Sequence, residues 1–140
     1  MLGQIDLLCI LLINVKLPLS QKISKFHYWT NSFFGGQIKL NLKRGIITVE
    51  INRMGSSNSS VVSHTPTKEE WEEFVTSLDI LKVWEWDKNY NDDHVCDGAS
   101  WSLTIHTNVL KLESGGYGKH PPNFGIFHQT INRLMSVDIY

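Results

Sequence analysis

The segment from Gln37 to Lys43 alternates strictly between polar and apolar side chains, and this alternation constrains the fold more than any other feature. Successive side chains of a β-strand point to opposite faces, so a period of two places all the apolar residues on one face. A tight reversal at Arg44-Gly45 leads into a second alternating run. The apolar residues of the two runs are Ile38, Leu40, Leu42, Ile47, Val49 and Ile51. The pattern predicts an antiparallel hairpin with one buried face and one face in water.

Four further segments alternate or are rich in aromatic and β-branched residues, which favours β-strands. They are Ser24–Trp29, Val83–Trp86, Ala99–His106 and Val109–Glu113. In the third segment we expect Trp101, Leu103 and Ile105 to point into the core. Three connecting segments are polar or rich in glycine, which is typical of loops. They are Arg53–Ser60, Asp87–Gly98 and Ser114–His120, the last of which leads into Pro121-Pro122.

Two segments have the periodicity of amphipathic helices. Thr67 and Glu70 match a capping box, in which the two side chains satisfy free amides at a helix start. The apolar residues of the two predicted helices are Trp71, Phe74, Val75, Leu78 and Leu81, then Phe124, Phe127, Ile131, Leu134 and Met135. Spacings of three and four residues place each set on one helix face. We therefore predict an α+β fold: a single domain of residues 22–140, with a mostly antiparallel β-sheet and two amphipathic helices packed on one face.

Residues 1–21 precede this domain and contain an apolar run from Ile5 to Val15. The run is interrupted by Asp6 and Asn14 and is shorter than the roughly 18–20 apolar residues of a transmembrane helix. A secretory signal has basic residues before its apolar region, but no Lys or Arg precedes this run. We interpret the segment as an apolar N-terminal extension, or as an additional strand or helix. We expect no membrane association and a cytoplasmic location.

The formal net charge of −1 removes the simplest argument for a nucleic-acid partner, which would be a basic chain. The charge is unevenly distributed: seven basic and two acidic residues precede Thr67, whereas six basic and twelve acidic residues follow from there. Acidic side chains in the first turns of a helix are favoured by its dipole, which explains part of this acidic cluster. Two cysteines, Cys9 and Cys96, are too few for a disulfide scaffold or a four-cysteine zinc site. We predict no nucleic-acid partner.

No motif in the chain predicts a metal, a cofactor or a catalytic residue. Asp87, Asn89 and Asn91 imitate the start of an EF-hand loop, but Asp92 and Gly98 stand where that loop needs Gly and Glu. The six histidines are scattered and form no zinc-binding pair. The Gly118-Lys119 pair lacks the following Ser or Thr of a phosphate-binding loop.

The candidate ligand-binding residues are polar and aromatic side chains of two loops. They are Asp97, His94, His120 and Tyr90. We expect any pocket to lie between the loop of residues 87–98 and the loop of residues 115–120. The competing interpretation is structural: Asp97-Gly98 makes a tight turn, and the carboxylate of Asp97 holds its own loop.

Several motifs together resemble a family of small, uncharacterised bacterial proteins. They are Phe26-x-Tyr28, Phe34-Gly35-Gly36, Trp84-x-Trp86 with Tyr90, Asp97-Gly98-x-x-Trp101-x-Leu103-x-Ile105, and Gly118-x-x-Pro121-Pro122-x-Phe124. In that family a DGxxWxLxI strand precedes a glycine-rich loop and a final helix that starts at two prolines. The family's loop often carries Gly-Ser-Asn where this chain has Gly115 to Gly118. The resemblance covers residues 24–134 and implies no activity.

Two classes of function fit this sequence. The first is a non-enzymatic module that binds another protein or associates with itself, in a role such as defence or toxin neutralisation. The second is a small enzyme or ligand-binding protein with its pocket between the two loops named above. Convergence of Asp97, His94 and His120 in one concave pocket would favour the second class.

Overall fold

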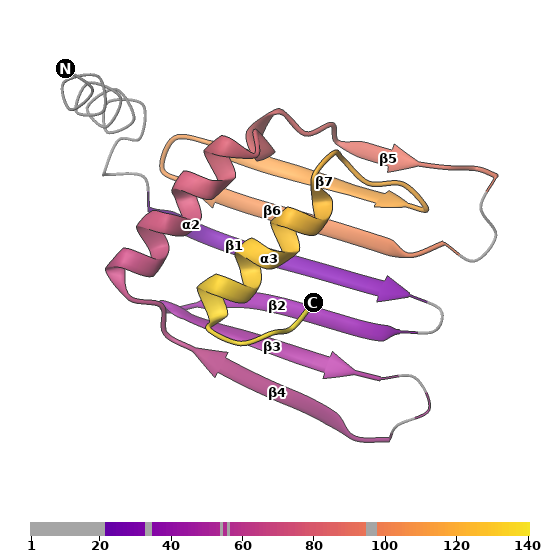
Figure 1. Ribbon diagram of the computed structural model, residues 1–140, viewed down its shortest axis with the longest axis horizontal. Coiled ribbons are helices and arrows are strands. Elements are labelled where there is room, and N and C mark those ends of the chain that lie inside the picture. Colours follow the sequence, from indigo (N-terminus) through magenta and orange to yellow (C-terminus); the bar gives the residue numbers. More distant parts are fainter. Residues whose placement is uncertain (1–21, 33–34, 54, 56, 95–97) are drawn as a thin grey trace, which may run out of the picture.

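The computed structural model describes residues 22–32, 35–53, 55, 57–94 and 98–140, and its strands form one seven-stranded sheet (Figure 1). The strands are β1 (Ile23–Ser32), β2 (Gly36–Lys43), β3 (Ile46–Asn52), β4 (Ser59–His64), β5 (Asn89–Asn91), β6 (Ser100–Thr107) and β7 (Lys111–Tyr117). They lie in the order β4-β3-β2-β1-β6-β7-β5. All neighbouring pairs are antiparallel except β5 with β7. The prediction of an α+β fold with a mostly antiparallel sheet is confirmed.

The predicted hairpin of alternating residues forms strands β2 and β3. Leu40 lies opposite Val49 and Leu42 lies opposite Ile47, so the apolar residues share one face. Leu40, Ile47 and Val49 are fully buried. The hairpin packs beside β1, which pairs with β2 on one side and with β6 on the other. The alternation therefore identified the hairpin and its buried face correctly, and the structure adds the register.

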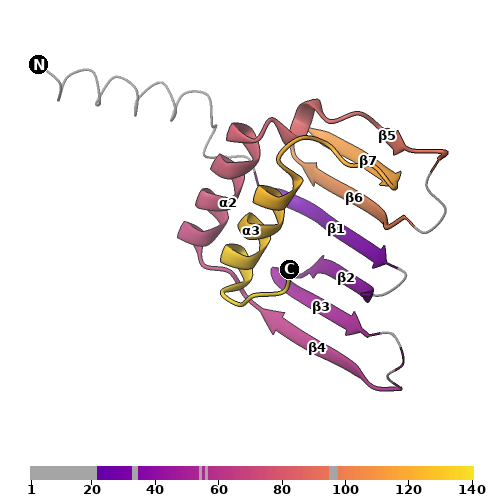
Figure 2. The ribbon, with the colours of Figure 1, turned by 45° about the vertical axis from the view of Figure 1, so that its right-hand side comes forward.

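Two helices, α2 (Lys68–Ile80) and α3 (Phe124–Met135), lie on the same face of the sheet (Figure 2). They bury Phe74 and Leu78 from α2, and Phe127, Ile131 and Leu134 among others from α3. The predicted apolar stripes are thus the faces that contact the sheet. None of the helices in the described part of the chain has the length and apolar character needed to cross a bilayer.

The capping box predicted at the start of α2 is present. The Thr67 hydroxyl accepts a hydrogen bond from the Glu70 amide at 3.1 Å, and the Glu70 carboxylate accepts one from the Thr67 amide at 2.9 Å. The same carboxylate accepts bonds from His64 of β4 and from Ser136 just after α3. The Thr67 amide, with the His64 and Ser136 side chains, holds the pKa of Glu70 at about 2 despite some desolvation. Glu70 therefore connects one edge strand to the ends of both helices.

The prediction of a strand at Val83–Trp86 is wrong, because Val83–Glu85 forms a short 3-10 helix. Lys82 adopts a left-handed conformation with φ 54°, which ends α2 and turns the chain sharply. The Trp84 indole then donates a hydrogen bond to Asp79 at 2.8 Å. The Trp86 ring packs against Phe127 with ring centroids 5.2 Å apart. The alternating aromatic residues are thus partly buried by a tight turn that packs them against the core, not by strand pairing.

The remaining differences concern the edges of the sheet. Residues predicted as loop form the end of β7 (Ser114–Tyr117) and the three-residue strand β5 (Asn89–Asn91). Strand β4 overlaps the predicted loop at Ser59 and Ser60, and its other residues were not predicted as a strand. Its side chains are mostly exposed, so it lacks the buried alternating face that identified the other strands. The final helix begins at Phe124, after a left-handed Asn123, rather than at the two prolines. The predicted N-terminal extension of residues 1–21 lies outside the described residues.

Removing the hydroxyl of Thr67 tests whether the capping box stabilises the start of α2. We expect Thr67→Ala to lower the free energy of unfolding by about 1 kcal/mol, because the Glu70 amide loses its partner. Urea denaturation followed by circular dichroism measures the change. Thr76→Ala is the matched control: its hydroxyl bonds only to the Glu72 carbonyl within the helix, so we expect no loss of stability. Equal effects of the two substitutions would contradict the assignment.

Candidate functional site

An open groove of about 460 Å³ lies on the helix-covered face. It is found where the end of β1, the start of β6 and the end of β7 come together, a region on the right-hand side of Figure 1. α3 and the segment that follows it form its other wall. The lining residues are Thr30, Asn31, Ser32, Gly35, Gly36, Ile38, Gly98, Ala99, Ser100, Trp101, Gly118, Lys119, His120, Phe124, His128, Ile139 and Tyr140. The volume falls within the range of roughly 300–1,000 Å³ that is usual for ligand sites.

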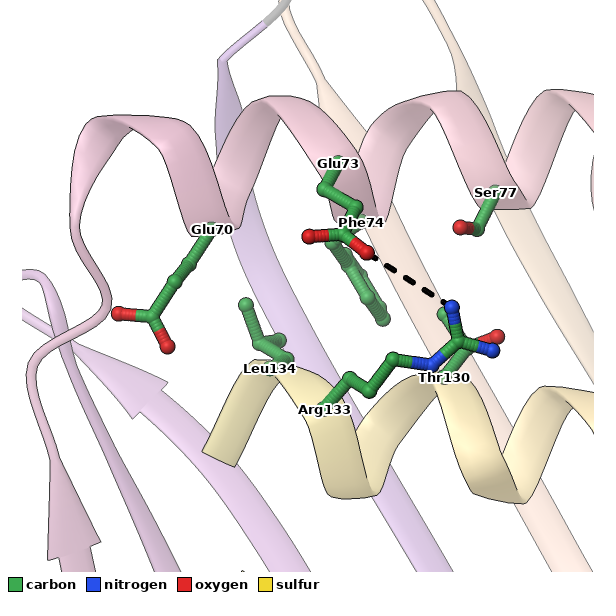
Figure 3. A pocket seen from close by; sticks show the side chains of 7 residues that line it. All are labelled: Glu70, Glu73, Phe74, Ser77, Thr130, Arg133 and Leu134. Atoms are coloured by element: carbon green, nitrogen blue, oxygen red, sulfur yellow. Dashed lines mark ion pairs between the residues drawn. The ribbon is translucent and has the colours of Figure 1, made fainter. Parts of the chain in front are cut away.

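A second, much smaller hollow lies between the two helices (Figure 3). Its volume of about 10 Å³ is room for no more than a single water molecule. Glu73 and Arg133 form an ion pair of 3.7 Å across its mouth, and both side chains are largely exposed. Such exposed pairs contribute little to stability. We therefore treat this hollow as a helix–helix contact and the larger groove as the candidate site.

Aromatic rings form the floor of the groove. Trp101 points inward from β6 and is only 5% exposed, and its ring centroid lies 4.9 Å from that of Phe124. The His120 ring is stacked on Phe124, with centroids 5.1 Å apart and planes 8° apart. Unlike the two rings beneath it, His120 is exposed at the rim. These rings supply flat apolar surfaces on which another planar or apolar group can pack.

A partly buried histidine, His128, lines the groove beside Tyr28 and Tyr140. The Tyr28 hydroxyl lies 2.6 Å from His128 Nε2, and the His128 ring is stacked on Tyr140 with centroids 4.2 Å apart. Burial, with a smaller contribution from the charge of His120, lowers the pKa of His128 to about 4. Burial also raises the pKa of Tyr28. The histidine is therefore neutral at pH 7, and the phenol donates its proton to Nε2.

The C-terminal residues of the described chain form a wall of the groove because Asn132 holds them. Its side-chain oxygen accepts hydrogen bonds from the amides of Ile139 at 2.8 Å and Tyr140 at 3.1 Å. Its side-chain nitrogen donates to the Tyr140 carbonyl at 3.1 Å. Burial raises the pKa of Tyr140 to about 12, so its ring enters the groove uncharged. No sequence pattern linked Asn132 to residues seven and eight positions further along the chain.

The turn that carries His120 is held by the indole of Trp101. Trp101 Nε1 donates to the Lys119 carbonyl at 2.9 Å, and the Gly118 amide donates to the Ala99 carbonyl at 2.9 Å. A Cβ on Gly116 would overlap the Tyr90 carbonyl and would lie 2.8 Å from both Lys119 O and Trp101 Nε1. Gly116 is therefore required by the close approach of β5, β6 and the 118–120 turn to β7, not by an unusual turn conformation.

The structure places the predicted site residues in different surroundings. His120 lines the groove, as expected of a pocket residue. Tyr90 packs against Trp101 at 5.9 Å and accepts a hydrogen bond from the Asp87 amide, so it supports the floor from outside the lining. His94 is exposed in a turn in which its amide donates to Asp92, and it is not among the lining residues. Asp97 lies outside the described residues, so a role for its carboxylate stays a prediction.

Other sequence motifs have a structural explanation. Asn89 and Asn91 belong to β5, and the Asp92 carboxylate caps its own turn. Among residues that the structure describes, no three His, Cys, Asp or Glu side chains come together as metal ligands would. Sequence reasoning missed His128 and Tyr140, because they meet β1 and β6 in the groove only after folding. It also missed Asn132, which holds the Tyr140 segment in place.

Comparison with known proteins adds no assignment: no family model, curated protein or solved structure matches the chain. The resemblance to small bacterial proteins therefore stays a prediction. The candidate site depends on the geometry described above.

We expect Gly116→Ala to lower the free energy of unfolding by about 2 kcal/mol or more, because the added methyl group overlaps backbone atoms in a packed site. Gly125→Ala is the matched control, since a Cβ there meets nothing within 4 Å and favours helix α3. Urea denaturation of both variants measures the difference. A Gly116→Ala protein as stable as the wild type would contradict the close packing described.

Titration of His128 predicts a pH dependence of stability. Its pKa is about 4 in the folded protein and close to 6.5 when unfolded, so the unfolded chain binds more protons in between. The free energy of unfolding should fall as the pH drops from 6.5 to 4, by about 2 kcal/mol once the partial exposure of the ring is allowed for. Urea denaturation across this range should give a shallower dependence for His128→Gln. His94→Gln, at an exposed position, should behave like the wild type.

Proposed function

We propose that this protein is a non-enzymatic protein-binding module whose groove receives an aromatic or large apolar side chain of the partner. The observation that carries the proposal is the floor of Trp101, Phe124 and His120 rings, which opens to solvent at the end of the sheet. Protein interfaces are commonly anchored by a few aromatic contacts of this kind at the centre of the buried patch.

The rim of the groove supports a macromolecular partner. Asn31, Ala99, Lys119 and His120 are exposed, so the hollow is an open trough. Sites for small molecules usually enclose most of the ligand surface. An open trough instead suits a side chain that projects from a larger surface, because the rest of that surface covers the rim. Polar rim residues can then form hydrogen bonds with the partner around an apolar centre.

The charges of the groove indicate which anchor it would accept. Lys119 is the one charged side chain among the described lining residues, and the two histidines stack on aromatic rings. A neutral aromatic anchor loses little hydration on entering such a site. An acidic residue beside the anchor would be attracted to Lys119, whereas a basic one would be repelled. The preferred partner segment therefore combines an aromatic side chain with a nearby carboxylate.

A small planar ligand is the second candidate, and the groove volume favours it. A hollow of about 460 Å³ accommodates a molecule of one or two fused rings. The stacked pair of His120 and Phe124 would contact the face of such a ring. The two candidates share the same floor and differ in whether the bound ring belongs to a chain.

A displayed library of random peptides tests the proposal. The wild-type protein should select peptides with an aromatic anchor, and chemical-shift changes on binding should centre on Trp101, Phe124 and the 118–120 turn. His120→Ala should weaken binding at least threefold, because an exposed stacking surface is lost. The control His94→Ala removes another exposed ring, outside the groove, and should leave the affinity unchanged.

Three results would decide against a peptide anchor. Selected peptides without aromatic residues would contradict it, and so would binding that His120→Ala and His94→Ala affect equally. The third result is an absence of groove-directed peptides while N-acetyltryptophanamide shifts the groove resonances of the wild type. That result would favour the small planar ligand instead.

A further inference from the structure

The two edges of the sheet differ in how they are protected. An edge strand presents unpaired N–H and C=O groups, and folded proteins usually shorten or charge such edges. Strand β5 has only three residues and lies between Lys88 and Asp92. Strand β4 has six residues, Ser59–His64, with no Lys, Arg, Asp, Glu or Pro among them. Its pairing with β3 is continuous over all six positions. Within the described part of the chain, β4 is therefore a regular, uncharged edge.

An apolar row on the helix-covered face ends at this edge. Tyr28 lies opposite Leu40, Leu40 opposite Val49, and Val49 opposite Val62, so the row crosses four strands. Tyr28, Leu40 and Val49 are fully buried, whereas Val62 is only partly buried. On the other face of the same strand, Val61 is 59% exposed. Both valines would lose contact with water if another strand were added beside β4.

We propose that β4 pairs with β4 of a second copy of this chain, in antiparallel orientation about a two-fold axis normal to the sheet. Such an axis keeps the helices of both copies on the same face of the joined sheet. Residues that lie opposite each other across the axis then point to the same face. The register that continues the apolar row sets Val62 opposite Val62 of the second copy. Val61 then lies opposite Ser63, and Ser60 lies opposite His64. The two sheets become one sheet of fourteen strands.

The composition of β4 favours a second copy as the occupant of this edge. A two-fold axis brings each residue close to itself or to its near neighbours, so a charged edge strand would repel its own copy. Strand β4 contains three serines, two valines and one histidine. The ring of His64 already bonds to the Glu70 carboxylate at 3.1 Å and is held toward α2. Neither like charges nor bulky side chains therefore oppose each other in the pairing.

The expected dimer is weak. Pairing of two six-residue strands buries less surface than the roughly 1,200–2,000 Å² of stable interfaces. We therefore expect a dissociation constant of about 10 μM to 1 mM for the dimer. Sedimentation velocity of the full chain over this concentration range should show a reversible rise from monomer to dimer. A monomer at all these concentrations would overturn the proposal. The partner of β4 would then be a strand of a different protein.

Charge substitution at the edge locates the interface. Val61→Lys should raise the dissociation constant at least tenfold, because it places an ammonium group from each copy beside the two-fold axis. Two controls make the same change at exposed apolar positions elsewhere: Ile80→Lys, at 75% exposure on α2, and Val109→Lys, at 64% exposure between β6 and β7. Both should dimerise as the wild type does. A dimer that Val61→Lys leaves intact would contradict pairing through β4.

Disulfide trapping tests the register. In a chain with Cys9 and Cys96 changed to Ser, Val62→Cys should form an intermolecular disulfide quickly under mild oxidation. Directly opposed residues of antiparallel strands have Cα atoms about 4.5–5.5 Å apart, which suits a disulfide. Ser60→Cys, two residues away on the same face, would lie opposite His64 and should cross-link slowly. Faster trapping at position 60 than at position 62 would overturn the proposed register.

Discussion

The burial of Tyr28 on the central strand is the constraint on which the core and the groove both depend. Its side chain is fully buried, and its ring contacts Phe124, Phe127, His128 and Tyr140. A phenol hydroxyl in such a place is costly unless it has a hydrogen-bond partner. His128 Nε2 provides that partner and thereby fixes the position of α3 over β1. Since α3 also carries Phe124 and Asn132, this one bond positions both the floor of the groove and the segment that walls it.

The groove exists because two short helices cannot cover a seven-stranded sheet. α2 and α3 have 13 and 12 residues, or roughly 20 Å each, and they lie side by side on one face (Figure 2). The apolar face of the strands extends beyond them toward the ends of β1 and β6. There Ile38 and Trp101 line the groove together with the Tyr140 segment and the turn that carries His120. The exposed remainder is what the proposed partner side chain would cover.

The edge strand β4 is likewise not fully covered by other elements. Helix α2 follows β4 directly, and Glu70 ties the two together through His64. This contact holds the C-terminal end of β4, while Ser59, Ser60 and Val61 remain exposed. The groove and the edge thus differ in chemistry: one offers aromatic faces, and the other offers backbone hydrogen bonds. The two proposals rest on separate observations.

Alternation and helical spacing were sufficient to predict β1, β2, β3 and β6, both helices and the α+β class, because those patterns record which side chains face the core. The same reasoning failed at Val83–Trp86, where an alternating segment forms a short 3-10 helix instead of a strand. It also failed at β4, where an exposed edge leaves no buried alternating face. Of the predicted site residues, His120 lines the groove, whereas Tyr90 and His94 do not. Periodicity along the chain is enough to identify which face of each element is buried. Which ends of the elements meet depends on the folded arrangement, because strand order, the Tyr28–His128 hydrogen bond and the bonds of Asn132 make Trp101, His128 and Tyr140 neighbours.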